Sequence, residues 1–310
     1  SGSGLPKNIE LQVPAKAGGG TDVVARAIAT QVGKDSGSNL TVQNNTDGSG
    51  VVAMEKVRSA KPDASSLLFF HTTMLIKTAT GVYDHSAVDD FTVIAVGQGT
   101  EKTGYVLVVP GDSPYNTTED LVEAAKAAPG SILMGVETGG SSHIMSGLFA
   151  KATGIDVKYV EAGSDTEKLT ALVGGSINAA LVNQNQAKQY VESGKAKALG
   201  CFSVDETGGE SAILPGVTSF VDQGYDCTFT TLFLVLGPKD MKAETVTALH
   251  DYFESAVVNP EVQNVLKPAG FDMTFFSQEE GLQKVKDQQE SLNDVVDMLG
   301  LGKGKEKWVK

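Results

Sequence analysis

The stretch Ala17-Gly18-Gly19-Gly20-Thr21-Asp22 lies between an apolar run, Ile9–Pro14, and a run with helical periodicity, Asp22–Gly33. The apolar run predicts a buried strand, and Val24 and Ile28 fall on one i, i+4 stripe of the predicted helix. A strand, a glycine turn and a helix N-terminus together favour anion binding. The first N–H groups of a helix lack intrahelical partners, and the helix dipole adds partial positive charge there.

A second turn repeats this pattern: Glu137-Thr138-Gly139-Gly140-Ser141-Ser142-His143 joins the predicted strand Ser131–Val136 to the predicted helix Ser142–Thr153. One such turn is weak evidence for a site. Two turns, far apart in the chain, indicate two similar lobes that each offer a helix N-terminus to one doubly anionic molecule.

Strands and helices alternate around both turns, which predicts parallel, doubly wound sheets of the α/β class. The first series has strands at Ile9–Pro14, Leu40–Gln43 and Ser66–Phe70, and further strands follow at Phe91–Gly97 and Tyr105–Pro110. A helix over Thr117–Ala128, with Thr117 or Asn116 as its N-cap, precedes the second series. That series has strands at Ser131–Val136, Val157–Val160, Ile177–Val182 and Ala196–Ser203, with helices at Ser142–Thr153, Asp165–Val173 and Ala187–Ser193.

The C-terminal part departs from this alternation. After a strand at Phe229–Leu236 it predicts helices near Met241–Val258, Pro260–Lys267 and Ser277–Leu299, which we expect to pack on the first lobe. Strands near Tyr105–Pro110 and Thr228–Leu236 are then expected to cross between the lobes as a hinge. The predicted lobes are 5–107 with 231–310, and 108–230, with 1–4 as a non-native start.

The composition limits the classes of partner. The 310 residues carry 25 basic and 38 acidic side chains, a net charge of −13, which argues against nucleic acid. An acidic protein that binds an anion must use local dipoles and N–H groups. Cys201 and Cys227 lie in strand-like runs, and the sequence leaves open whether they form a disulfide or remain buried thiols.

Ordered motifs along nearly the whole chain carry a family resemblance. They are Val13–Asp22, Val42–Gly50, Val109–Tyr115 with Asp120-Leu121, Gly135–His143, Leu172–Ala180, and Pro215–Phe220 with Gln223-Gly224-Tyr225. From about Leu5 to Leu301, the sequence resembles the extracytoplasmic solute receptors of tripartite tricarboxylate transporters, the Bug family. Two segments depart from the family's pattern: Ala162–Glu167 is more acidic, and Thr230-Thr231-Leu232 replaces a common aromatic residue.

The resemblance implies a two-lobed periplasmic-binding-protein (venus-flytrap) fold with two doubly wound sheets and two crossover strands. It also implies capture of a small di- or tricarboxylate between the lobes and delivery to the membrane permease of a tripartite tricarboxylate transporter. The expected location is extracytoplasmic, either in the periplasm or lipid-anchored to the outer face of the cell membrane. We expect a monomer, no cofactor and no metal.

The expected ligand-binding residues are glycines, hydroxyls and amides that donate to carboxylates and other polar groups. They are Ala17, Gly18, Gly19, Thr21, Thr72, Thr73, Thr138, Gly139, Gly140, Ser141, Ser142, Gly163, Ser164, Asn183 and Thr230. Three neighbours have other expected roles. Asp22 caps its own helix, His143 is a structural imidazole, and Lys16 points to solvent.

Catalysis is poorly supported, because no nucleophile elbow, Walker loop or metal-ligand spacing of the four histidines occurs. Two alternatives remain open. One is an α/β enzyme that binds a phosphate ester at Gly18–Thr21, and the other is a ligand-sensing module without a transporter.

Overall fold

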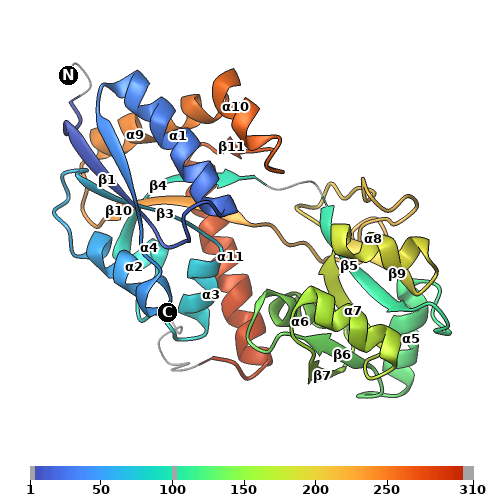
Figure 1. Ribbon diagram of the computed structural model, residues 1–310. Helices are drawn as coiled ribbons and strands as arrows, with labels where there is room; N and C mark the ends of the chain where they lie inside the picture. Colours follow the sequence, from blue (N-terminus) through green and yellow to red (C-terminus); the bar gives the residue numbers. More distant parts are fainter. Residues whose placement is uncertain (1–3, 100–102, 303–310) are drawn as a thin grey trace. The chain divides into compact units, whose positions relative to one another are not determined.

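The computed structural model describes residues 4–99 and 103–302, and the chain divides into two compact units (Figure 1). Of the described residues, unit 1 comprises 4–99, 231–294 and 302, whereas unit 2 comprises 103–230 and 295–301. The described residues 103–107 and 295–301 therefore belong to unit 2 rather than to the first lobe. The predicted non-native start, apart from Gly4, and the segment 303–310 lie outside the described residues.

Unit 1 contains a six-stranded sheet in the order β11-β4-β10-β3-β1-β2. Its strands are β1 (Asn8–Val13), β2 (Asn39–Asn44), β3 (Ser66–His71), β4 (Phe91–Gln98), β10 (Leu232–Pro238) and β11 (Thr274–Phe275). The strands β1, β2 and β3 pair in parallel, as the βαβαβ pattern predicts. By contrast, β10 runs antiparallel between β3 and β4, so the sheet is mixed.

Helices cover both faces of this sheet. They are α1 (Gly20–Ser36), α2 (Val51–Arg58), α3 (Thr73–Ala79), α4 (Ala87–Asp90), α9 (Ala243–Val257), α10 (Pro260–Leu266) and most of α11 (Gln278–Met298), with a 3-10 turn, η1, at Asp47–Gly50. Because side chains alternate along a strand, Leu67 and Phe69 of β3 pack into the core beneath α1, α9 and α10. The helices α2 and α3 pack against the same strand and lie on the opposite face (Figure 1).

Unit 2 contains a five-stranded sheet in the order β7-β6-β8-β5-β9. Its elements are β5 (Thr103–Pro110), α5 (Thr118–Ala127), β6 (Leu133–Val136), α6 (Ser141–Thr153), β7 (Lys158–Glu161), α7 (Asp165–Gly174), β8 (Ala179–Asn183), α8 (Gln184–Glu192) and β9 (Ala196–Ser203). Alternate residues of β5 again face two cores. Leu107 and Val109 pack with residues of α5 and α6, and Val106 and Val108 pack with residues of α7 and α8.

The two strands expected to cross between lobes each pair within one sheet. β5 lies between β8 and β9 in unit 2, running antiparallel to both. β10 lies between β3 and β4 in unit 1. The end of α11 and the residues after it pack on unit 2. If Gly147 of α6 carried a Cβ, that atom would lie 2.7 Å from Val295 Cγ2, so this close approach requires a glycine.

The two cysteines are free and buried in unit 2. Burial raises the pKa of the Cys201 thiol to about 12, with Asp222 adding to the effect, and burial also raises the pKa of Cys227. Of the two alternatives that the sequence left open, the structure therefore shows the buried thiols. None of the helices in the described ranges is long and apolar enough to cross a bilayer.

Candidate functional site

The turn between β6 and α6 is held by bonds within its own few residues. Gly139 has a φ of +78°, a conformation that favours glycine. The N–H of Gly140 donates to the Glu137 carbonyl at 2.9 Å, and the N–H of Glu137 donates to Ser142 Oγ at 2.9 Å. The helix then begins at Ser141 with Gly140 as its N-cap, and no side chain caps it.

Other N–H groups of this turn already have partners. The Gly139 N–H donates to His143 Nδ1 at 3.1 Å, and both the N–H and the hydroxyl of Thr138 donate to the Glu161 carboxylate. The N–H groups of Ser141 and Ser142, at the first two helical positions, have no carbonyl four residues back within the helix. They are therefore the backbone donors that this helix can offer to a ligand.

His143 has a structural role, as expected. Its side chain is buried, its ring lies 4.9 Å from that of Tyr159, and its Nδ1 accepts the Gly139 N–H. Burial lowers the pKa of His143, outweighing the opposite effect of Glu161. The imidazole is therefore neutral near pH 7 and keeps the lone pair that holds the turn.

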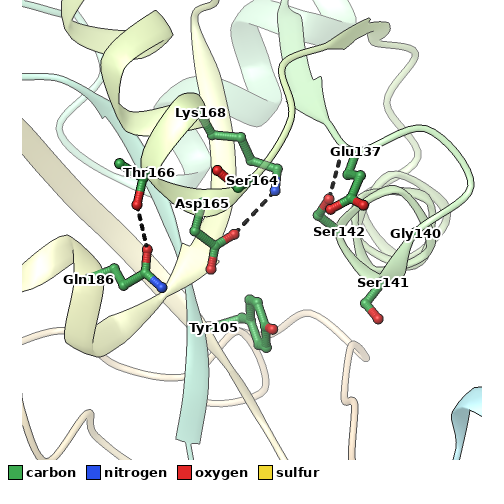
Figure 2. Close-up of a pocket in the computed structure, with 10 residues that line it drawn as sticks. All are labelled: Tyr105, Glu137, Gly140, Ser141, Ser142, Ser164, Asp165, Thr166, Lys168 and Gln186. Atoms are coloured by element: carbon green, nitrogen blue, oxygen red, sulfur yellow. Dashed lines mark hydrogen bonds and ion pairs between the residues drawn. The ribbon is translucent and has the colours of Figure 1, made fainter. Parts of the chain in front are cut away.

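A cavity of about 440 Å³ opens beside this helix N-terminus, entirely within unit 2 (Figure 2). The volume suits a small organic molecule. Gly140, Ser141, Ser142 and Glu137 line one side, and residues of β5, α7 and α8 line the others. The full lining is Tyr105, Glu137, Gly140, Ser141, Ser142, Ser164, Asp165, Thr166, Lys168 and Gln186.

An ion pair lies on the side of the cavity formed by α7. Lys168 Nζ is 3.1 Å from Asp165 Oδ1, and the lysine side chain is only 2% exposed. Asp165 Oδ2 also accepts the N–H of Asn183 at 3.0 Å. Burial raises the pKa of Tyr105, with the Asp165 charge adding to it, so this phenol remains a hydrogen-bond donor.

Three expected ligand donors of unit 2 instead hold local structure. The Ser164 hydroxyl accepts the N–H of Glu167 in a capping box at the start of α7. The side chain of Asn183 accepts the N–H of Asn185 and so caps α8. Gly163 has a φ of +75°, and a Cβ there would lie 2.5 Å from Glu167 Oε2. Ser164 also lines the cavity.

The expected ligand-binding residues leave out six that line the cavity: Tyr105, Glu137, Asp165, Thr166, Lys168 and Gln186. Two of these residues could have been identified from the sequence, because they lie at the start of a helix that follows a strand. Asp165 begins the helix after β7, and Gln186 lies in the first turn of the helix after β8. Lys168 follows Asp165 by three residues, a spacing that brings side chains together on a helix.

The glycine turn of unit 1 shares the uncapped helix start but uses its N–H groups differently. Gly18, with a φ of +83°, donates its N–H to Asp22 Oδ2 at 2.8 Å. The Gly19 N–H donates to the Lys16 carbonyl at 3.2 Å. Gly19 is the N-cap of α1 and supplies no side-chain cap, so the first-turn N–H groups are those of Gly20, Thr21 and Asp22.

Asp22 fastens this turn rather than capping α1. Its buried carboxylate accepts from Gly18, from Arg26 Nε at 3.0 Å and from Asn44 Nδ2 at 2.8 Å. Burial raises the pKa of Asp22, but these donors lower it by more, so the net pKa lies below its usual value. Ala17 and Lys16 are exposed, as expected for Lys16.

The remaining expected residues lie at strand ends. Thr72 accepts the N–H of Leu232 at 2.8 Å and donates to Gln288 Oε1 at 2.7 Å, which ties β3, β10 and α11 together. Thr73 begins α3, an element that the sequence interpretation missed, and its N–H donates to His71 Nδ1 at 3.2 Å. Thr230 is half-buried at the end of the segment 101–230.

Two further clusters in unit 1 are unsuited to an anion or already engaged. A cavity of about 630 Å³ is lined by several carboxylates, among them Asp89, Asp90 and Glu290, which oppose a negative ligand. On α9, a ring nitrogen of His250 and carboxylate oxygens of Asp251 and Glu254 lie within 4.8 Å of one another. Its Nε2 lies 2.8 Å from the Phe276 carbonyl, so this imidazole connects α9 to the segment after β11.

Comparison with known proteins shows the family to which this chain belongs. The family model described as "Tripartite tricarboxylate transporter family receptor" matches residues 24–301. A relative from Cupriavidus necator, the UPF0065 protein in the gbd 5' region, is 26% identical over 95% of this chain and 88% of its own length. Protein BugT of Bordetella pertussis is 22% identical over 84% of this chain and 80% of its own.

Solved structures share the fold. A TctC solute-binding protein from Polaromonas superposes with a TM-score of 0.78 at 24% identity, covering 94% of this chain and 98% of that one. MatC from Rhodopseudomonas palustris, solved with malate, gives 0.61 at 19% identity over 93% and 98%. A further R. palustris protein, solved with adipate, gives 0.62 at 22% identity over 94% and 97%. The chain thus has the periplasmic-binding-protein fold and belongs to the tripartite tricarboxylate transporter receptor family, the TctC or Bug solute-binding proteins.

Proposed function

We propose that this receptor captures a small organic carboxylate. In unit 2 the N-terminus of α6 holds a carboxylate group, and in unit 1 the N-terminus of α1 offers donors of the same kind. One observation carries the proposal: an uncapped helix N-terminus, with the N–H groups of Ser141 and Ser142, opens into a cavity of about 440 Å³. Charge-assisted bonds from such donors contribute on the order of 1.5–3 kcal/mol each.

Within unit 2, a comparison of three helix N-termini supports α6 as the one that binds the ligand. The helices α6, α7 and α8 each follow a strand of the same sheet, and side chains of Ser164 and Asn183 cap α7 and α8. Only α6 of these three begins without a side-chain cap. The uncapped N–H groups and the adjacent serine hydroxyls therefore offer donors that the other two helices have already used.

The solved relatives support a carboxylate as the ligand class, since one was solved with malate and another with adipate. We further propose that the protein works outside the cytoplasm as a monomer, without a cofactor or catalytic residues. It would pass its ligand to the membrane permease of a tripartite tricarboxylate transporter.

A matched set of N-cap variants tests the proposal. Gly140 and Gly19 both have extended backbone at the N-cap, which aspartate adopts readily. Gly140→Asp supplies α6 with its own carboxylate acceptor, so the N–H groups no longer serve a ligand. Gly140→Ala adds the Cβ without the acceptor and is the control. Gly19→Asp and Gly19→Ala form the corresponding pair on α1.

Binding is measured by thermal shift against malate, adipate, citrate, acidic amino acids, nucleotides and sugar phosphates. A carboxylate at about 100 times its Kd should stabilise the wild type by roughly 2.7 kcal/mol. We expect both aspartate variants to lose this shift and both alanine variants to keep most of it. Stabilisation by nucleotides or sugar phosphates alone would instead favour the phosphate-ester enzyme.

A further inference from the structure

We infer that α9 carries a binding site for one divalent transition-metal cation such as Zn²⁺, with His250, Asp251 and Glu254 as its ligands. These side chains lie in unit 1, whereas the cavity described above lies in unit 2, so the inference does not depend on the proposed carboxylate function. The sequence-based expectation of no metal rested on spacings among the histidines, whereas two of these three ligands are carboxylates.

The imidazole of His250 is held in one orientation by the backbone. Its side chain is only 4% exposed, and its Nε2 lies 2.8 Å from the carbonyl oxygen of Phe276. A carbonyl oxygen can only accept, so Nε2 carries a proton, and Nδ1 of the neutral ring keeps a lone pair. Histidines that bind metals are held in the same way, because the donated N–H fixes the tautomer and turns the other nitrogen toward the ion.

The lone pair of His250 Nδ1 faces a second acceptor rather than a donor. Asp251 Oδ1 lies 3.1 Å from Nδ1, and an ionised carboxylate has no proton to donate. Two such acceptors repel each other unless a cation lies against both. Two ligand atoms about 2.1 Å from one zinc ion, at octahedral or tetrahedral angles, lie about 3.0–3.4 Å apart. The observed separation is therefore the one expected of two ligands of one metal ion.

Glu254 supplies the third ligand from the next helical turn. It follows His250 by four residues, a spacing that places both side chains on one side of a helix. One ligand atom from each of the three residues lies within 4.8 Å of the other two. The Glu254 side chain is 48% exposed, so it can rotate toward the ion without disturbing the core. Among the described residues, His250 is the only basic group within 4.0 Å of either carboxylate.

The donor set favours a transition metal over Mg²⁺ or Ca²⁺. Imidazole nitrogen suits zinc and its neighbours in the periodic table, whereas Mg²⁺ and Ca²⁺ prefer oxygen ligands alone. A metal on Nδ1 keeps the proton on Nε2, which strengthens the bond from His250 to Phe276 and so the contact of α9 with the segment after β11. Metal binding should therefore stabilise the folded chain.

A second histidine of unit 1, His85, provides a comparison. Its Nδ1 lies 3.4 Å from Asp90 Oδ2, and its Nε2 lies 3.9 Å from Glu55 Oε1. The same Glu55 oxygen already accepts from Arg58 Nε and from the Tyr83 hydroxyl, each at 2.7 Å. Glu55 is thus engaged by other donors, whereas Asp251 and Glu254 remain available to a cation.

Calorimetric titration of the metal-free full chain with ZnCl₂ tests the inference, with MgCl₂ as the comparison. We expect Zn²⁺ to bind the wild type at one site and to raise its thermal unfolding temperature. Mg²⁺ at the same concentration should do neither, and equal binding of Mg²⁺ would contradict a site that depends on imidazole. Glu254→Gln changes an exposed side chain and should weaken Zn²⁺ binding by about tenfold or more. His250→Gln should weaken it at least as much.

Two variants serve as controls and should leave the Zn²⁺ affinity unchanged. Glu244→Gln removes an equal charge at an exposed position of the same helix, and His85→Gln removes the comparison histidine. Equal affinity in Glu254→Gln and Glu244→Gln, or a loss of binding in His85→Gln, would place the ion elsewhere and overturn the inference. Failure of Zn²⁺ to bind the wild type would overturn it as well. None of these results bears on the proposed carboxylate function.

Long-range ¹H–¹⁵N correlation spectra of the histidine side chains distinguish the metal from a proton. We expect Nε2 of His250 to stay protonated while the Nδ1 resonance moves to that of a metal-bound nitrogen when Zn²⁺ is added. An imidazolium with protons on both nitrogens, unchanged by Zn²⁺, would show that a proton joins Nδ1 to Asp251. That result would overturn the inference.

Discussion

At the scale of single residues, side chains that fold back on the two glycine turns decide which N–H groups remain for a ligand. Asp22 takes the N–H of Gly18, His143 takes that of Gly139, and Glu161 takes that of Thr138. Because these three N–H groups are already bonded, the N–H groups that remain for a ligand are those of the first helical turn. The turns themselves thus act as rigid supports, and the helix N-termini provide the donors.

A half-buried histidine of unit 1, His71, gives a pH dependence of stability. Burial lowers the pKa of His71 to about 4, with Lys77 adding to the effect, and its neutral Nδ1 accepts the Thr73 N–H. The unfolded histidine, with a pKa near 6.5, binds a proton first as the pH falls. The unfolded state is therefore favoured progressively between about pH 6.5 and 4.

We expect the free energy of unfolding of the wild type to decrease over that range and His71→Gln to reduce the slope. Denaturant titrations at several pH values measure this. Ligand affinity between pH 6 and 8 should stay constant, because the proposed donors are backbone N–H groups and burial lowers the pKa of both His71 and His143. An unchanged slope in the variant would refute the assignment to His71.

These residue-level details mark the limit of the sequence interpretation. The glycine turns are recognisable because a turn needs φ > 0 at Gly18 and Gly139, and glycine provides it. The partner of each N–H depends on side chains several residues or a whole strand away, such as Glu161 on β7. The lining residues Tyr105 and Lys168 lie within a strand and a helix rather than in a glycine turn, so motif reading did not find them.

At the scale of elements, capping separates helices that support the fold from those that offer donors. The side chain of Thr117 caps α5 by accepting the Asp120 N–H, and the Asp120 side chain completes a capping box. Thr117 was one of the two N-caps that the sequence predicts. By contrast, α1 and α6 begin at glycines that leave their first N–H groups uncapped.

Removing the α5 cap should cost stability without affecting the ligand site. We expect Thr117→Ala to lower the free energy of unfolding by about 1 kcal/mol, because one helix N–H loses its acceptor. Chemical denaturation measures the loss. Ligand affinity should stay at the wild-type value, since Thr117 does not line the cavity in unit 2. A large fall in affinity would mean that α5 takes part in the site.

At the scale of the whole molecule, alternating strands and helices predict the α/β class correctly, but the strand directions follow from tertiary pairing. The strands β5 and β10 each run antiparallel to their neighbours within one sheet, and their apolar composition does not predict that direction. Likewise, periodicity identifies α11 but not the assignment of 295–301 to unit 2, which depends on close packing at Gly147.

The central claim is that a small carboxylate is held by the first-turn N–H groups of α6. The most direct test follows the backbone amide resonances of ¹⁵N-labelled protein during titration with aspartate and with succinate. We predict that the amide protons of Ser141 and Ser142 shift downfield and show the largest changes in unit 2. Changes centred on the acidic cavity of unit 1, around Asp89 and Glu290, with Ser141 and Ser142 unmoved, would contradict the account.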